Sequence, residues 1–147
     1  MLFEEDLLRN EHRISSMDKQ PKLFSRNTRV ENVHDRAMMV EVRQTSPDVL
    51  VMTVEIPPGE HEYICHEDIP GPAGGRPGYV IVYIEGAREM SKKYIHPIDI
   101  MANEKLELNY SSEGGFTITL TRGNFIRRLG FIIRLKRVAQ QIKSLGK

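Results

Sequence analysis

The fold is decided by the stretch of residues 105–121, which reads KLELNYSSEGGFTITLT. Leucine and tyrosine occupy every second position of 105–110, and phenylalanine, isoleucine and leucine alternate with threonine over 116–121. A period of two residues is typical of strands that have one apolar face. The segment 111–115 between them, SSEGG, has the composition of a turn. The stretch therefore predicts an antiparallel β-hairpin.

A second hairpin is predicted upstream by the same kind of pattern. Residues 38–42 and 50–56 each carry apolar side chains at every second position. The segment 44–48 that joins them contains Ser46-Pro47-Asp48, residue types that favour turns. We therefore expect two antiparallel strands here as well.

Three further segments are predicted to extend the β structure. Residues 79–85 are apolar on both faces, which indicates a strand in the buried centre of a sheet. Residues 60–66 are expected to form a shorter strand. Residues 94–100 are interpreted as an edge strand or a loop, because Pro97 cannot donate to a ladder. The strand count, with no helix predicted before residue 123, favours a compact antiparallel sheet structure.

A chain of 147 residues has about the length of one domain. Within this domain the sequence predicts three parts. Residues 1–36 are rich in charge with scattered apolar positions and are interpreted as a polar arm. Residues 37–122 form the β domain, and 123–147 form a basic C-terminal helix. The predicted fold class is mainly β (α+β): an antiparallel β-sandwich or small barrel with an extended N-terminal arm and a C-terminal basic amphipathic helix.

The helix prediction depends on apolar residues that recur at steps of three and four: Phe131, Leu135, Val138, Ile142 and Leu145. They predict a helix over about 131–145, with a kink or break at Gly130. An alternative interpretation takes 129–135 as an alternating strand and leaves only 137–145 helical. The sequence does not decide between the two.

The charge of the chain is strongly polarised. The last acidic residue is Glu113, so the first 113 residues hold all 20 acidic residues and 13 of the 21 basic ones, a formal charge of −7. The remaining segment carries +8. Such asymmetry predicts that the tail meets an anion, whether nucleic acid, a lipid headgroup or an acidic protein surface.

Two sets of contact residues follow. The tail predicts contacts with an anion or a partner through Arg122, Arg127, Arg128, Arg134, Lys136, Arg137 and Lys143. The Gly/Pro-rich loop 70–78 predicts a partner contact through Gly74, Gly75 and Arg76. Its prolines remove the N–H donors that a phosphate-binding loop needs. The tail has no Trp or Tyr for base stacking, so any contact with nucleic acid would be made to the phosphates.

No catalytic, metal or cofactor site is predicted. His61, Cys65 and His66 are close in sequence, but on an extended segment His66 points away from the other two. The chain lacks the pattern of a hydrolase nucleophile turn. We therefore expect a protein that is not an enzyme.

The expected function is structural. No apolar run is long enough to span a bilayer, the acidic start does not fit a signal peptide, and the single Cys65 cannot form an intrachain disulfide. We expect a cytoplasmic protein, or a virion component if the source is viral. An arm, a protruding loop and oppositely charged ends are typical of a protein that forms homo-oligomers or larger assemblies. The alternative is a nucleic-acid-binding module, and contact with a membrane surface ranks below both.

Overall fold

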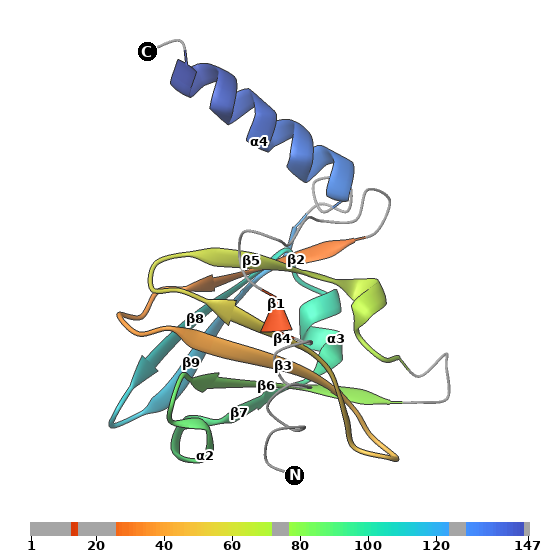
Figure 1. Ribbon diagram of the computed structural model, residues 1–147, viewed down its shortest axis with the longest axis vertical. Helices are drawn as coiled ribbons and strands as arrows, with labels where there is room; N and C mark the ends of the chain where they lie inside the picture. Colours follow the sequence, from red (N-terminus) through yellow and green to blue (C-terminus); the bar gives the residue numbers. More distant parts are fainter. Residues whose placement is uncertain (1–12, 15–25, 72–76, 124–128, 146–147) are drawn as a thin grey trace.

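The computed structural model describes residues 13–14, 26–71, 77–123 and 129–145. These residues form a mainly β fold with a long C-terminal helix, as the sequence predicts (Figure 1). The described elements are β1 (Arg13–Ile14), β2 (Asn27–Asn32), β3 (Met38–Gln44), β4 (Val49–Ile56), β5 (His61–Cys65), η1 (His66–Asp68), β6 (Gly78–Ile84), α2 (Arg88–Ser91), β7 (Lys93–Ile95), α3 (Pro97–Met101), β8 (Lys105–Ser111), β9 (Gly115–Thr121) and α4 (Gly130–Leu145).

One sheet has five strands in the order β1-β4-β3-β6-β7. Strand β3 pairs antiparallel with β4, which confirms the predicted hairpin over 38–56. Strand β6 lies between β3 and β7, and its outward-facing Ile81 is also buried, which confirms the central position predicted for 79–85. The two-residue strand β1 pairs in parallel with β4 at the edge.

The second sheet has four strands in the order β5-β2-β8-β9. Strands β8 and β9 pair antiparallel over their whole length, which confirms the hairpin predicted for 105–121. Gly115 begins β9 with a φ of 72°, a conformation that glycine adopts without strain. Strand β2 pairs antiparallel with β5 but in parallel with β8, so the fold is not antiparallel throughout.

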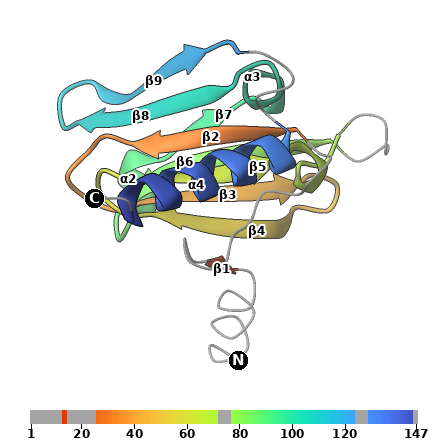
Figure 2. The ribbon, with the colours of Figure 1, turned by 90° about the horizontal axis from the view of Figure 1, so that it is seen from above.

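The core fills the space between the two sheets, which lie face to face as in a sandwich (Figures 1 and 2). No ladder joins one sheet to the other among the described strands. Both sheets contribute to a single apolar cluster because alternate residues of each strand point inward. Its fully buried members are Met38, Val40, Val42, Val54, Ile56, Ile64, Val30, Val80, Val82, Ile84, Ile100, Leu106 and Leu108.

The sequence predicts that residues 1–36 form an arm, but the structure places strand β2 inside this range. This correction has the largest effect on the fold. Its inward positions include polar residues, and their bonding potential is satisfied inside the protein. Thr28 Oγ1 lies 2.6 Å from the Ile100 carbonyl oxygen, and Asn32 Nδ2 donates to the Ile56 carbonyl at 2.9 Å. A strand of this composition lacks the apolar alternation that sequence analysis detects. Residues 1–12 and 15–25 of the predicted arm lie outside the described residues.

Short helices also interrupt the β domain, so the expectation of no helix before residue 123 is wrong. The segment 94–100, predicted as an edge strand or a loop, contains the edge strand β7 and then helix α3. Pro97 lies in the first turn of α3, where a backbone N–H would have no hydrogen-bond partner within the helix, so the lack of an N–H in proline costs nothing. His96 is the N-cap, and its Nδ1 accepts a hydrogen bond from the Ile98 N–H.

Helix α4 confirms the helix predicted for 131–145 and excludes the alternative strand over 129–135. It begins at Gly130, the position predicted for a break. The helix extends from the body beside the ends of β5 and β2, on the outer side of the four-stranded sheet (Figures 1 and 2).

Candidate partner and anion-binding surface of the C-terminal helix

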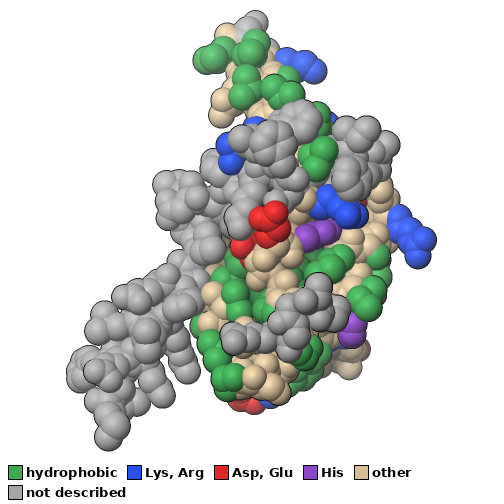
Figure 3. Space-filling view, turned by 90° about the vertical axis from the view of Figure 1, so that its right-hand side faces the viewer, with side chains coloured by type: hydrophobic (Ala, Val, Ile, Leu, Met, Phe, Trp, Pro, Cys, Tyr) green, Lys and Arg blue, Asp and Glu red, His purple; other side chains and the backbone are tan. Residues whose placement is uncertain are grey.

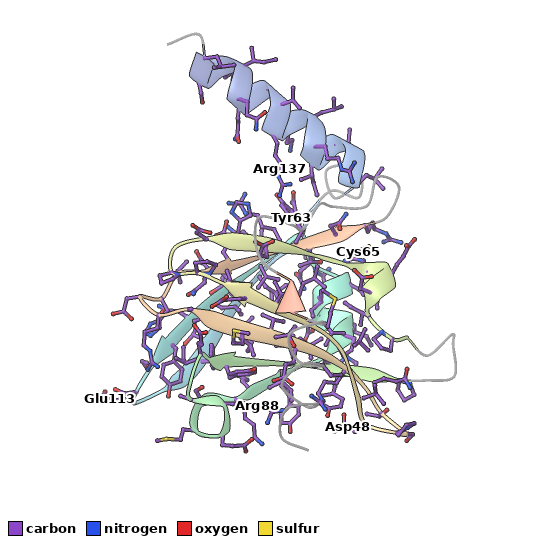
Figure 4. All side chains as sticks on the ribbon, viewed as in Figure 1. Asp48, Tyr63, Cys65, Arg88, Glu113 and Arg137 are labelled. Atoms are coloured by element: carbon purple, nitrogen blue, oxygen red, sulfur yellow. The ribbon has the colours of Figure 1, made fainter. Side chains whose placement is uncertain are left out.

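Helix α4 touches the body through its first turns. Ile133 is buried, and the Arg137 guanidinium carbon lies 5.2 Å from the centre of the Tyr63 ring on β5. Figure 4 shows the side chains of Arg137 and Tyr63 meeting between the helix and the sheet. A guanidinium over a tyrosine face is attracted by the negative face of the ring. This contact holds the polar and basic side of α4 toward the sheet.

The apolar stripe of α4 points away from the body. Leu135, Val138, Ile142 and Leu145 are 60%, 51%, 64% and 87% exposed. At about 100° per residue, these residues lie on the side of the helix opposite to Ile133 and Arg137. Figure 3 shows hydrophobic side chains on the protruding upper end of the molecule. We call these four residues the α4 stripe; in the described structure they remain on the surface.

A cleft of about 590 Å³ lies between α4 and the outer face of the four-stranded sheet. Cationic side chains reach it from three elements: Arg29 of β2, Lys105 of β8, and Lys136 and Arg137 of α4. The lining also includes Asn27, His61, Tyr63, Glu104, Thr121, Ile133 and Gln140. Since Glu104 is the only acidic residue among the described residues that line the cleft, this lining has an excess of positive charge.

The charges of the cleft are partly compensated from one side. Glu31 accepts from Arg29 at 2.7 Å and lies 3.9 Å from the Lys105 ammonium. The Arg29 Nε is buried and has no hydrogen-bond acceptor among the described residues. Burial, followed by the positive charge of Arg29, lowers the pKa of His61 below its usual 6.5, which favours the neutral imidazole. The remaining positive potential suits a polyanion or a phosphate group.

The structure places five of the seven predicted tail cations. Lys136 and Arg137 line the cleft, Arg134 is half-buried on α4, and Lys143 and Arg122 are exposed. Arg127 and Arg128 lie outside the described residues, as do Gly74, Gly75 and Arg76 of the predicted partner loop. The cleft thus unites Lys136 and Arg137, and of the other described tail cations Arg122, Arg134 and Lys143 are not part of its lining.

Sequence analysis missed Arg29 and Lys105 as members of this surface. The alternation of residues 105–110 assigns Lys105 to the outer face of its strand, so half of the signal is present in the sequence. Arg29 gives no such signal because β2 is not recognisable as a strand. Only the parallel pairing of Arg29 with Lys105 across β2 and β8 brings the two cations together.

The residues considered for metal binding or catalysis are placed separately. Cys65 is a buried free thiol, His66 Nε2 lies 2.8 Å from Thr28 Oγ1, and His61 lines the cleft. Within the described ranges, no group of three or more His, Cys, Asp or Glu side chains is arranged to hold a metal ion.

A second charged cluster lies on the outer face of the five-stranded sheet. Glu41 Oε1 accepts from Arg43 Nη1 at 2.8 Å, and Glu41 Oε2 accepts from Arg88 Nε at 2.9 Å. Arg43 also donates to Asp48, and Arg88 to Glu89. Charges alternate along this chain of contacts and compensate one another locally. The cluster therefore has the character of a structural network rather than of an anion site.

None of the described helices is long and apolar enough to cross a membrane. Comparisons with protein-family models, with curated proteins and with solved structures give no match for this chain.

Proposed function

We propose that this chain is a non-enzymatic structural protein that assembles with further copies of itself through α4. The α4 stripe is the observation that carries the proposal. The stripe consists of four large apolar side chains on one face of a protruding helix. Burying them lowers the free energy by about 25 cal/mol for each Å² of apolar surface that is removed from water. An amphipathic helix that turns its polar side to its own body has its apolar side available to another molecule.

A second copy is the occupant that fits the spacing of the stripe. Leu135, Val138, Ile142 and Leu145 follow one another at steps of three, four and three residues, the spacing by which helices pack against like helices. Lys136 and Arg137 line the cleft on the opposite side, so they would not meet their counterparts. Arg134 lies next to the stripe, and its repulsion between copies is weakened by salt.

The other predicted contact regions would then extend the assembly. The arm within residues 1–36 and the loop at 70–78 supply further surfaces for neighbouring copies or for a larger complex. A viral or phage particle is one setting for such a protein, by analogy with its parts rather than by any sequence match.

The test of this proposal is substitution within the stripe. Ile142→Glu places a carboxylate where the proposed contact excludes water, and the lost burial of one isoleucine is worth about 1.5–3 kcal/mol. Because both copies carry the substitution, this loss counts twice, and the concentration at which half of the protein is associated is expected to rise about a hundredfold or more. Light scattering coupled to size-exclusion chromatography over a range of concentrations measures this shift.

Met90→Glu is the matched control, because Met90 is 90% exposed on α2, away from α4. It introduces the same charge at an exposed apolar position and is expected to leave the association unchanged. An equal effect of both substitutions would show that charge in general, and not the stripe, controls association, and the proposal would fail.

The cationic cleft favours nucleic-acid binding as a second candidate function. Arg29, Lys105, Lys136 and Arg137 surround one space, and each could neutralise a phosphate of a strand that runs past it. Binding of this kind carries no base specificity and depends steeply on salt concentration.

This candidate predicts that Arg137→Glu weakens the binding of a single-stranded oligonucleotide and reduces its salt dependence. Each lost phosphate contact reduces the slope of log K against log salt by about 0.7. Fluorescence anisotropy at several salt concentrations measures both quantities. Arg36→Glu is the control, because the Arg36 guanidinium donates to the Glu85 carbonyl away from the cleft. Binding that neither substitution changes would exclude the cleft.

A further inference from the structure

Strand β9 is the open edge of the four-stranded sheet. It has seven residues and pairs, among the described strands, with β8 alone. Figure 2 shows β9 at the margin of the molecule, away from α4. Thr117 and Thr119 on its outer face are exposed. An edge of this length presents a row of backbone groups to solvent.

Two contacts indicate which backbone groups face the open side. The Thr121 carbonyl accepts from the Glu104 N–H at 2.8 Å, so it points toward the β8 side. The Phe116 carbonyl accepts from the Lys93 side chain of β7 at 3.3 Å. Backbone groups of successive residues point to opposite sides of a strand. The N–H and C=O groups of Ile118 and Leu120 therefore point to the open side.

The other outer strands carry features that prevent edge pairing. Strand β7 has only three residues and contains Lys93, and Pro97 follows it closely. Strand β5 carries Glu62, which is buried on the inward face. Strand β1 has two residues. Lysine, inward-pointing charges and short length are the usual protections of sheet edges.

The residues of β9 itself supply none of these protections, and the Lys93 side chain of β7 reaches the Phe116 carbonyl at one end of the strand. Its sequence, GFTITLT, contains neither a charged residue nor proline, and its threonines, isoleucine and phenylalanine favour strands. The core also ends incompletely at this edge, since Phe116 is buried whereas Leu120, also on the inward face, is 45% exposed. A strand added beyond β9 would cover Leu120.

We infer that β9 pairs antiparallel with β9 of a second copy, which joins two four-stranded sheets across a twofold axis. The residues of β9 bring no like charges together when the strand faces its own copy, and a twofold pairing would satisfy the open Ile118 and Leu120 backbone groups of both copies at once, so a second copy is the partner that fits this edge. The inference extends the proposed function by naming a second contact, separate from the α4 stripe. Two different twofold contacts on one chain generate assemblies larger than a dimer.

The test uses two substitutions, alone and combined. Thr117→Lys places a charge on the exposed face of β9 in each copy, so that two like charges approach one another across the proposed contact. Ile142→Glu weakens the helix contact. Light scattering is expected to give a species larger than a dimer for the wild type and a dimer, twice 16.9 kDa, for each single variant. The combined variant is expected to be a monomer of 16.9 kDa.

Asn109→Lys is the matched control, because Asn109 is the cross-strand neighbour of Thr117 on the inner strand β8 and is also exposed. It is expected to behave as the wild type. Hydrogen exchange adds a readout that is local to the edge: the Ile118 and Leu120 amides are expected to be protected in the Ile142→Glu variant and to exchange faster when Thr117→Lys is added.

The outcomes separate this inference from the proposed function. A monomeric Ile142→Glu variant beside an associated wild type would overturn the β9 contact and leave the helix contact standing. A Thr117→Lys variant that is monomeric while Ile142→Glu has no effect would support the β9 contact and overturn assembly through α4.

Discussion

Replacing Leu106 by alanine is expected to lower the free energy of unfolding by about 2–5 kcal/mol. Leu106 is fully buried in the core between the sheets, where it lies opposite Val30 of β2 and Leu120 of β9. The truncation removes apolar contacts and leaves a cavity that strands fixed on both sides cannot close. Because a domain of this size is stable by only about 5–15 kcal/mol, the loss is a large fraction of the total. Urea denaturation followed by circular dichroism measures it.

Leu120→Ala is the control for this prediction. Leu120 is the direct cross-strand partner of Leu106 but is 45% exposed, so the same truncation removes less buried surface. Its effect is expected to be less than half that of Leu106→Ala. Equal losses at the two positions would contradict the described packing of the four-stranded sheet.

Replacing Glu41 by glutamine is expected to destabilise the protein at neutral pH and to have little effect in acid. Burial raises the pKa of Glu41, but the hydrogen bonds from Arg88, Tyr83 and Arg43 outweigh it and hold the pKa below the usual 4.5. A carboxylate with a lowered pKa contributes stability above its unfolded-state value and loses it as the pH falls through its folded-state value.

The measurement is denaturant unfolding of the wild type and the variant at several values of pH. The difference in free energy of unfolding is expected to be largest at neutral pH and to shrink below about pH 4.5. Glu113→Gln, at an exposed position of the β8–β9 turn, is expected to match the wild type throughout. A Glu41→Gln difference that does not change with pH would show that the charge of Glu41 contributes nothing.

The strands that the sequence predicts are those whose core face is apolar at every second position. In β3, β4, β8 and β9 the core face is formed by alternating hydrophobic residues, so the period of two is visible in the chain. Strand β6 is predicted for a related reason: Val82 and Ile81 are buried on opposite faces, and a continuous apolar run results.

Strand β2 could not be predicted because its burial depends on distant partners. Asn27 and Thr28 are buried polar residues, and Thr28 is acceptable in the interior only because the Ile100 and Asn103 carbonyls lie within hydrogen-bond distance. Those partners are more than 70 positions away in sequence. A pattern of local hydrophobicity contains no information about them.

The candidate surface was predicted in part for similar reasons. The spacing of the apolar residues predicts α4, and the charge count predicts that it is basic. Neither the spacing nor the charge count shows which side of α4 faces the body. Ile133 and Leu135 are both apolar, and only the packing of α4 against β5 makes Ile133 buried and Leu135 exposed. The contribution of Arg29 depends on the parallel pairing of β2 with β8, which joins segments far apart in the chain.

Sedimentation velocity of the unmodified chain is the direct test of self-association. Measured from micromolar to near-millimolar concentration, at low and at high salt, the mass is expected to rise above 16.9 kDa with concentration and to persist at high salt. A mass of 16.9 kDa at every concentration and both salt conditions would contradict it.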